Sequence, residues 1–598
     1  MIYVCYLFGN FAFSIAVALA DIPTRSESNV PYDNLSIVSK SVETLPWAQP
    51  NQTASSIKCR CSPGDKCWPS ASVWDAFNAT IGGRLIATTP LAAPCHNSAF
   101  GLYDAIECAN LQAAWLTPDL HEESPSSVMA PYFANSSCNP FLPAASPCIV
   151  GTYVSYSVNV SQPMDIARAL WFATYFNIRV VIKNTGHDYN GKSTGAGAIG
   201  LWTHNLKEIE IIDYKSVNYT GKAIKVGAGV QVEEAYAAAS ARGLAVVGGE
   251  CPTVGYAGGY TQGGGHSALS SKHGLAADQV LEWEVVDGRG RLLKANPSVN
   301  PDLYWALCGG GGGSFGVVTS MTSKAYQDIP ITGANISFTS AGISQDRFYN
   351  VVEVYLKSLP VIVDAGAVTV SFLSNETFAV SPLTAPGLSP KEVYRLLSPL
   401  TSELEKYNIS YNYNVQSFRG YLQQFSAQSA CSDVGTGLYG GRFIPRSIVK
   451  DKIAQLTAAY RYINSHGGVL AIIGLNVSRA VTGHVWNSVN AAWRETLIET
   501  VIQTNYNQTA SIQDNKKAQD QITHDFVPQL ERLTPGGGAY LNEGDFQQPG
   551  WQQVFYGDNY NTLVDIKSRY DPFQLLYAIT AVGSEYWTPQ NDGRLCKA

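Results

Sequence analysis

Three glycine clusters in the middle of the chain most constrain what it can fold into. They span residues 186–197, 255–265 and 309–316. Glycine lacks a Cβ and tolerates positive φ, so a ligand can lie directly against the backbone and its N–H groups. Two nucleophilic side chains, His187 and Cys251, stand in or beside these clusters. One cluster alone would mark an ordinary turn, but three around two nucleophiles predict a site for a flat, multiply charged cofactor.

A flavin with its pyrophosphate fits this pattern, and we interpret His187 and Cys251 as two covalent tethers for it. The alternative for His187 is a core histidine that hydrogen-bonds the backbone. The alternative for Cys251 is a disulfide or a buried thiol. A dinucleotide-binding fingerprint at Gly227-Ala-Gly229 is a weaker match, because Val232 stands where its third glycine belongs. The other residues predicted to contact the flavin are Gly186, Asp188, Gly191, Ser193, Gly255, Gly258, Gly259, Gly263, Gly264, Gly265 and Asn559.

Composition describes a well-buried globular protein. Of 598 residues, 45% are hydrophobic and only 15% charged, and the length predicts two or three domains. The formal net charge is −7 and no basic run stands out, so neither a nucleic acid nor an anionic membrane is an expected partner. No metal site is predicted, because Cys59-Arg-Cys61 and Cys67 lack a second half with zinc-ligand spacing.

The N-terminus predicts secretion. Residues 1–20 are almost wholly apolar and end in Ala18-Leu19-Ala20, as in a secretory signal peptide, with a membrane anchor as the alternative. No later segment has eighteen uninterrupted apolar residues, so no stable membrane association is expected. Eleven acceptor sequons predict a secreted glycoprotein. They lie at Asn34, Asn51, Asn78, Asn135, Asn159, Asn218, Asn335, Asn375, Asn408, Asn476 and Asn507.

Hydrophobic periodicity divides the chain. Residues 153–158, 164–176 and 180–182 predict a strand–helix–strand unit that leads into the His187 loop, and residues 223–229 and 232–240 repeat strand and helix. Beyond residue 330, strands such as 367–373 alternate with amphipathic helices such as 447–456. The predicted organisation is a signal peptide (1–20), a cysteine-rich N-terminal extension (21–140), an FAD-binding domain (141–328), a substrate-binding domain (329–535) and a C-terminal segment that packs back on the FAD domain (536–598).

Several motifs resemble the vanillyl-alcohol-oxidase/PCMH flavoprotein superfamily, and more narrowly its berberine-bridge-enzyme-like branch. The matching segments are 186–193, 251–259, 272–280, 302–319, 556–560 and 566–572, and segment 59–70 is similar to fungal members described as isoamyl-alcohol-oxidase-like, some of which act in secondary metabolism. The resemblance implies an α+β fold with a PCMH-type two-part FAD-binding domain, an α+β substrate domain with an antiparallel sheet, and the cysteine-rich extension. It also implies FAD bound bicovalently, through His187 to the 8α methyl and through Cys251 to C6.

The catalytic residues depart from a familiar pattern. Many relatives carry a basic tyrosine in a Tyr-x-Asn-Tyr motif, whereas this chain reads Tyr540-Leu-Asn-Glu543. A carboxylate beside an apolar flavin face would act as general base. The alternative is that Glu543 is solvated or salt-bridged. Tyr540 and Tyr560 are the other candidates for the base.

Cysteine use supports an oxidising compartment, since seven of the twelve cysteines lie between Cys59 and Cys148 and predict disulfides. Removal of Cys5 with the signal peptide leaves eleven cysteines. Assigning Cys251 to the flavin leaves ten, which could all pair, unless Cys308 stays a buried free thiol.

Three functions follow from these features. The leading prediction is a secreted, monomeric FAD-dependent oxidase that removes hydride from an alcohol or similarly activated C–H of a small organic substrate and passes electrons to O₂, giving H₂O₂. The second keeps the cofactor but ends in oxidative cyclisation or desaturation in a secondary-metabolite pathway. The third is a non-enzymatic secreted glycoprotein with a decayed site, against which the two tethers and three glycine clusters argue.

Overall fold

A computed structural model describes residues 58–428 and 433–598 of the chain. The predicted signal peptide, with Cys5, and the sequons at Asn34 and Asn51 lie outside the described residues.

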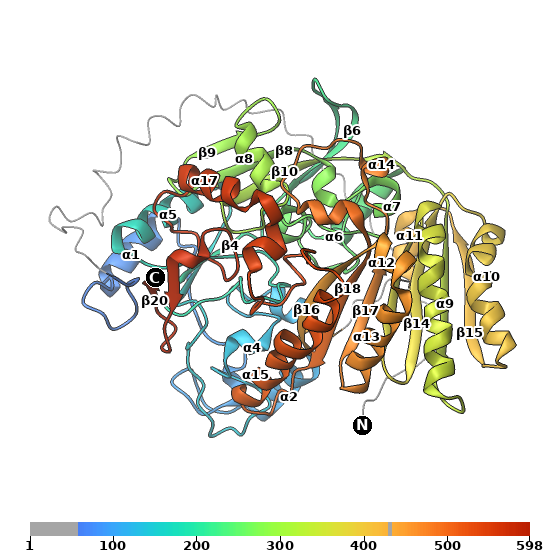
Figure 1. Ribbon diagram of the computed structural model, residues 1–598. Coiled ribbons are helices and arrows are strands. Elements are labelled where there is room, and N and C mark those ends of the chain that lie inside the picture. The colour runs from blue at the N-terminus through green and yellow to red at the C-terminus, as the bar shows by residue number, and fades with distance from the viewer. Residues whose placement is uncertain (1–57, 429–432) are drawn as a thin grey trace. The chain divides into compact units, whose positions relative to one another are not determined.

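The first sheet has four strands and carries the predicted strand–helix–strand unit (Figure 1). Strand β2 (Tyr156–Asn159) leads into helix α5 (Pro163–Phe176) and then into β3 (Val180–Lys183). Both strands pair in parallel with β4 (Ile199–Trp202), while β1 (Leu85–Ala87) adds an antiparallel edge. The prediction of this unit is confirmed. Because the chain leaves β3 directly into the His187 loop, the sheet places that loop at the carboxyl end of its strands.

Helix α5 begins and ends where local chemistry dictates. Asp165 Oδ2, in the first turn, accepts hydrogen bonds from the backbone N–H groups of Ser161 and Gln162, which satisfies two donors at the start of the helix. At the other end Asn177 adopts left-handed φ and ψ of 53° and 40°, a conformation that stops the helix. The buried face of α5 therefore packs in one register and directs β3 toward the loop.

A second, antiparallel sheet has five strands in the order β5, β6, β10, β8, β9. These are Ile209–Lys215, Thr220–Gly227, Gly316–Lys324, Val280–Asp287 and Leu292–Ala295. Helix α6 (Val232–Ser240) follows β6, as the sequence predicts.

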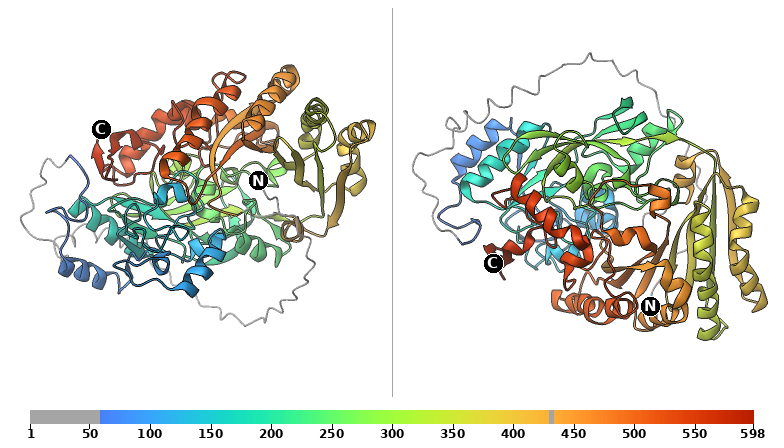
Figure 2. Two further views of the ribbon diagram at one scale, coloured as in Figure 1. Left: turned by 90° about the horizontal axis from the view of Figure 1, so that it is seen from below. Right: turned by 45° about the horizontal axis from the view of Figure 1, so that its top comes forward.

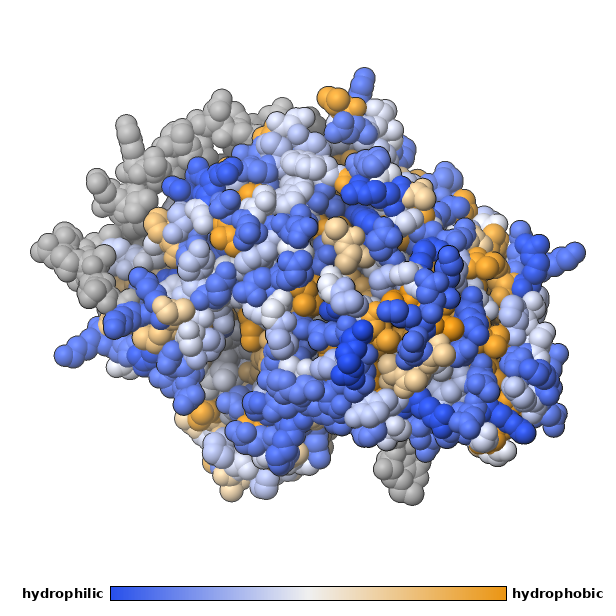
Figure 3. Space-filling view, viewed as in Figure 1, coloured by the Kyte–Doolittle hydropathy of each residue, from blue (hydrophilic) through white to orange (hydrophobic). Residues whose placement is uncertain are grey.

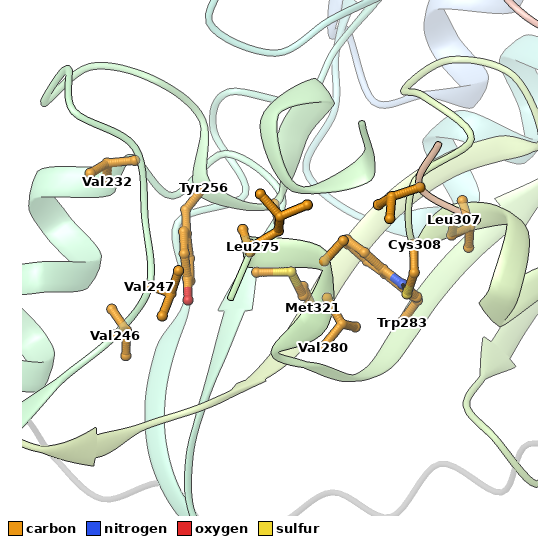
Figure 4. Close-up of a cluster of buried hydrophobic side chains, with 14 of the residues drawn as sticks. Val232, Val246, Val247, Tyr256, Leu275, Val280, Trp283, Leu307, Cys308 and Met321 are labelled. Carbon is orange, nitrogen blue, oxygen red and sulfur yellow. Dashed lines mark hydrogen bonds between the residues drawn. The ribbon is translucent and has the colours of Figure 1, made fainter. Parts of the chain in front are cut away.

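A buried apolar cluster fills the space beside the second sheet (Figure 4). Trp283 of β8 and Met321 of β10 belong to it, and the indole Nε1–H of Trp283 donates a 3.3 Å hydrogen bond to Cys308 Sγ. Among the described residues Cys308 is a free, fully buried thiol. The expectation that ten cysteines all pair is therefore wrong, and the alternative for Cys308 is confirmed.

The third sheet is antiparallel and has seven strands in the order β15, β12, β14, β13, β17, β18, β16. They are Tyr411–Phe418, Ile331–Thr339, Thr377–Pro386, Val368–Leu373, Val469–Gly474, Thr496–Asn505 and Gly437–Pro445. Helices α9 (Gln345–Asp364), α10 (Pro390–Lys406) and α13 (Ile453–Ser465) pack on one face and form a second core with it (Figures 1 and 2). The opposite face is left for the cavity described below.

One predicted helix is divided in the structure. The periodicity of residues 447–456 predicts a single helix, but α12 (Arg446–Asp451) ends at Lys452 and α13 begins at Ile453. Lys452 has a φ of −137°, outside the helical range. No glycine or proline marks this break, so periodicity alone could not reveal it.

Four disulfides tie the N-terminal region down. Cys61–Cys67, Cys95–Cys108 and Cys138–Cys148 close short loops, and Cys59–Cys596 joins the two ends of the described chain. The last pair links the extension to the C-terminal hairpin of β19 (Trp587–Pro589) and β20 (Leu595–Lys597). The expected disulfides of this region are therefore present.

The surface in view is mainly hydrophilic, with hydrophobic residues in scattered groups (Figure 3). Within residues 58–428 and 433–598, no helix combines the length and the apolarity needed to cross a membrane. Most described sequons reach the surface, but Asn476 is buried, and its Nδ2 donates to Asp364 Oδ1 at 2.8 Å. Asn476 is thus a poor glycan acceptor in the folded protein.

Candidate active site

A cavity of about 390 Å³ lies between the glycine loops and the free face of the seven-stranded sheet. Its lining comes from the loop after β3, the loop around Cys251, the loop before β10, residues 540–543 and 576–578, and strands β13, β16, β17 and β18. His187, Cys251, Tyr540 and Glu543 all reach it. The structure therefore brings together four predicted site residues that are separated by up to several hundred positions in the sequence.

His187 is held as a neutral imidazole. Its Nε2 lies 2.6 Å from Thr253 Oγ1 and 4.0 Å from Cys251 Sγ. Burial, with the nearby His121 and Lys183, lowers the pKa of His187 to about 3. A neutral ring keeps one nitrogen lone pair free of a proton at physiological pH, which is the form that can act as a nucleophile or covalent ligand.

Cys251 occupies the position predicted for the second tether, because its Sγ lies beside the His187 ring on the cavity wall. In this structure Cys251 is disulfide-bonded. A disulfide and a thioether to a flavin exclude one another, so attachment at Cys251 requires its thiol to be reduced when the cofactor is taken up.

Some residues of the glycine loops line the cavity, and others fix the shape of the loops. Gly191 has a φ of +69°, and a Cβ there would stand 2.3 Å from the Phe133 ring, so only glycine fits. Asp188 hydrogen-bonds the Lys192 N–H and the Ser193 hydroxyl, and thereby folds the His187 loop on itself. The cavity is lined by the predicted residues Gly186, Asp188, Ser193, Gly255, Gly258 and Gly259.

Other predicted cofactor residues lie off the cavity wall. Gly263, Gly264 and Gly265 do not line it; a Cβ on Gly263 would stand 2.5 Å from Asn542 Nδ2. These glycines allow the chain to pack closely under the C-terminal segment. Asn559 Nδ2 donates to the carbonyl oxygens of Ser488 and Val489, so its visible role is to hold two segments together.

The lining suits a flavin nucleotide. Gly259 is exposed toward open space, with no atom within 4 Å of the position that a Cβ would occupy. The side-chain Oδ1 of Asn184, on the same wall, is buried without a hydrogen-bond partner, which indicates a donor on the missing ligand. The backbone-lined loops, the neutral His187 and this orphaned acceptor together fit FAD.

Filling the open space at Gly259 tests this fit. Gly259→Val is expected to lower the flavin content of the purified protein severalfold, because the added methyl groups occupy cofactor space, while Gly259→Ala has a smaller effect. The visible absorbance per polypeptide measures the content, and the melting temperature of each variant controls for folding. Full flavin content in Gly259→Val would contradict a cofactor at this wall.

A cluster of three carboxyl groups surrounds His266 at one end of the cavity. His266 Nε2 lies 3.0 Å from Glu543 Oε1 and 3.8 Å from Glu499 Oε2, and its Nδ1 lies 3.8 Å from Glu250 Oε1. Glu543 is therefore salt-bridged, as the alternative reading of this residue expected. It nevertheless lines the cavity, and its side chain stays partly exposed there.

Protonation states in this cluster follow from burial and charge. Burial, with the neighbouring Glu543, raises the pKa of Glu499 well above its ordinary value, which favours its neutral form. Burial alone would lower the pKa of His266, but Glu543, together with Glu499, raises it well above its ordinary value, which favours the imidazolium. His266, Glu499 and Glu543 lie within 4.8 Å of one another, as in a metal site, yet this imidazolium already supplies a cation.

Of the two tyrosines proposed as the catalytic base, only Tyr540 lines the cavity. Tyr540 lines the cavity and accepts a 2.7 Å hydrogen bond from Asn542 Nδ2. Burial, with Glu543 nearby, raises the pKa of Tyr540 well above its ordinary value, so it is a neutral phenol rather than a ready base. Tyr560 does not line the cavity, and its hydroxyl bonds Glu585 at 2.6 Å instead. The structure therefore gives no support to Tyr560 as the base.

Three residues of the cluster around His266 were not predicted from the sequence: His266 itself, Glu250 and Glu499. His266 directly follows the glycines 263–265, and Glu250 directly precedes Cys251. Glu499 offered a usable signal, because it is a lone charged residue inside the apolar run of β18 and is buried.

Comparisons with known proteins agree with this geometry. A profile of the FAD binding domain matches residues 154–296, and one described as berberine and berberine like matches residues 539–582. The FAD-linked oxidoreductase patO of Aspergillus clavatus is 50% identical over 542 residues, which cover 90% of this chain and 94% of the relative. The bifunctional decalin synthase calF of Penicillium decumbens is 42% identical over 559 residues, covering 92% of this chain and 96% of the relative.

Solved structures give the same result. The crystal structure of the VAO-type flavoprotein MtVAO615 from Myceliophthora thermophila C1 superposes with a TM-score of 0.87 at 40% sequence identity, covering 90% of this chain and all of that one. The VAO-type flavoprotein MtVAO713 superposes with a TM-score of 0.84 at 29% identity, covering 91% of this chain and all of that one.

Proposed function

The chain belongs to the VAO-type, berberine-bridge-enzyme-like family of FAD-linked oxidoreductases, and we propose that it is an oxidase of small organic alcohols or similarly activated C–H bonds. The observation that carries the proposal is that His187 and Cys251, on glycine loops, line the same cavity as the carboxylate of Glu543. FAD held there would supply a two-electron acceptor, which dioxygen would reoxidise with release of H₂O₂.

In the proposed reaction Glu543 removes the substrate's hydroxyl proton. Its carboxylate is partly exposed to the cavity, and the imidazolium of His266 holds it at 3.0 Å. A charge-assisted hydrogen bond of this kind fixes the position of a base without occupying all of its lone pairs. Tyr540, as a neutral phenol, orients the substrate rather than accepting its proton.

The proposed attachment of FAD is bicovalent, through His187 and Cys251. The neutral state of His187 and the 4.0 Å separation of its Nε2 from Cys251 Sγ support it. Because Cys251 is disulfide-bonded in this structure, attachment of FAD at Cys251 would require that disulfide to be reduced first.

The deciding experiment is acid denaturation of the purified protein, followed by a flavin spectrum and mass spectrometry of its peptides. Flavin mass on both the His187 and Cys251 peptides, with H₂O₂ release on screening alcohols, is the expected result. Flavin on the His187 peptide alone would reject the second tether, and a colourless polypeptide would reject the cofactor chemistry altogether.

A second candidate function is oxidative cyclisation or desaturation in a secondary-metabolite pathway. The relative named a bifunctional decalin synthase, 42% identical to this chain, favours it. Product analysis separates the two: a simple carbonyl supports the first function, and a ring or a C–C double bond supports the second.

We also propose that the protein is a secreted monomer. Four disulfides among the described residues support an oxidising compartment. A mass shift on glycosidase treatment of the culture-medium protein, and its elution on gel filtration as one chain, are the results that this predicts.

A further inference from the structure

The cavity face of the seven-stranded sheet is apolar over three adjacent strands. Alternate residues of a strand point to one face, and the register places Val370 opposite Ile473, Phe372 opposite Ala471, and Ala471 opposite Val501. All five line the cavity. The neighbouring Leu470, Ile472 and Ile502 point the other way, into the core beneath helices α9 and α13.

Polar groups mark the two ends of this apolar face. On β18, Glu499 lies next to Ile473 in the register and Gln503 lies next to Val469. Four residues of strand separate their Cα atoms by about 13 Å. Val501, midway, faces the cavity between them. The reacting cluster of His266, Glu543 and Glu499 lies at the Glu499 end of this face and not at the Gln503 end.

A pair of stacked tyrosines encloses the far end. Tyr439 of β16 is in register with Gln503, and its ring stacks on Tyr189 with centroids 4.1 Å apart. Tyr189 belongs to the His187 loop, so the stack joins that loop to the sheet. A substrate body would therefore be covered on both sides along the apolar stretch.

Charge and hydrogen bonding select against two common substrate types. The acidic and basic side chains of the cavity wall are Asp188, Lys192, Glu250, Asp433, Glu543, His187 and His266, and Glu499 adjoins them. Acids outnumber cations, and Glu250 and Glu543 both lie beside His266 at the reacting end, so an anionic substrate would meet like charge. A sugar would leave most of its hydroxyls unpaired against valine, alanine and isoleucine.

We propose that this site takes a neutral, largely apolar alcohol with a medium-length carbon skeleton, which lies along Phe372, Ala471 and Val501 with its hydroxyl at Glu543. The proposal rests on the oxidase function above and names its substrate class.

Ligand titration of the flavin-loaded protein under anaerobic conditions tests it, since either a shift or bleaching of the visible flavin band reports occupancy. The probes are n-butanol, n-hexanol, n-octanol, octanoate and cellobiose. Apparent affinity is expected to rise about fourfold per methylene along the alcohols, and octanoate is expected to bind at least about tenfold more weakly than n-octanol.

Variants locate the binding on the sheet. Ala471→Phe fills the middle of the apolar face and is expected to weaken n-octanol at least about tenfold while sparing n-butanol. Val501→Thr keeps the shape, adds one hydroxyl and serves as the milder second variant, with a loss of a few-fold for n-octanol. Preferred binding of cellobiose or octanoate, or unchanged n-octanol affinity in both variants, would overturn the substrate class while leaving the oxidase intact. A protein without a flavin band would overturn both, and is recognised before any ligand is added.

Discussion

Glu543→Gln is expected to slow flavin reduction by substrate about 10²–10⁴-fold, the usual contribution of a positioned general base. The amide keeps the size of the side chain and can still hydrogen-bond, but it cannot accept the substrate proton. The 3.0 Å contact with His266 shows that Glu543 is held in place rather than mobile in solvent. Anaerobic stopped-flow reduction, with the best alcohol found by H₂O₂ release, measures the effect.

Two comparisons make this result specific. Glu376→Gln, on an exposed hairpin far from the cavity lining, is the matched control and should leave the rate unchanged. Glu499→Gln should slow flavin reduction less than Glu543→Gln, because burial raises the pKa of Glu499 and favours its neutral form, whose charge the amide keeps. A reduction rate in Glu543→Gln equal to the parent rate would remove Glu543 from the mechanism.

His187→Ala is expected to move the whole covalent flavin to the Cys251 peptide and to lower the oxidation rate by about tenfold or more. One tether holds the ring less firmly and raises its reduction potential less, and an activation barrier higher by about 1.4 kcal/mol corresponds to a tenfold slower rate. Peptide mass spectrometry after acid denaturation gives the attachment, and peroxide release gives the rate.

The complementary variant separates the two tethers. Cys251→Ser should leave flavin on the His187 peptide alone, and the double variant should release all flavin into the acid supernatant. The exposed His484 supplies a matched histidine control, since His484→Ala should retain both links. If Cys251→Ser does not change the flavin-bearing peptides, the disulfide at Cys251 persists in the mature protein and His187 is the single tether.

Local sequence chemistry predicted the elements that position the cofactor. The strand, helix and strand that lead to His187 have strong periodicity, and Asp165 in the first turn of the helix caps its start locally, so neighbours in the fold need not specify them. Where local signals are absent the prediction was wrong, as in the division of one expected helix at Lys452. Glycine content alone also did not separate the residues that line the cavity from those that do not, such as Gly263, Gly264 and Gly265.

The sequence by itself determined the family, the paired nucleophiles His187 and Cys251, and the replacement of a familiar tyrosine by Glu543, because each depends on residues within a short segment. Only the tertiary structure decided which residues share the reacting end of the cavity. His266, Glu250, Glu499 and Glu543 come from separate loops and from a strand of another sheet, and their distances depend on how those layers pack. Burial and mutual charge then set the protonation of Glu499 and His266, and neither quantity exists until the chain is folded.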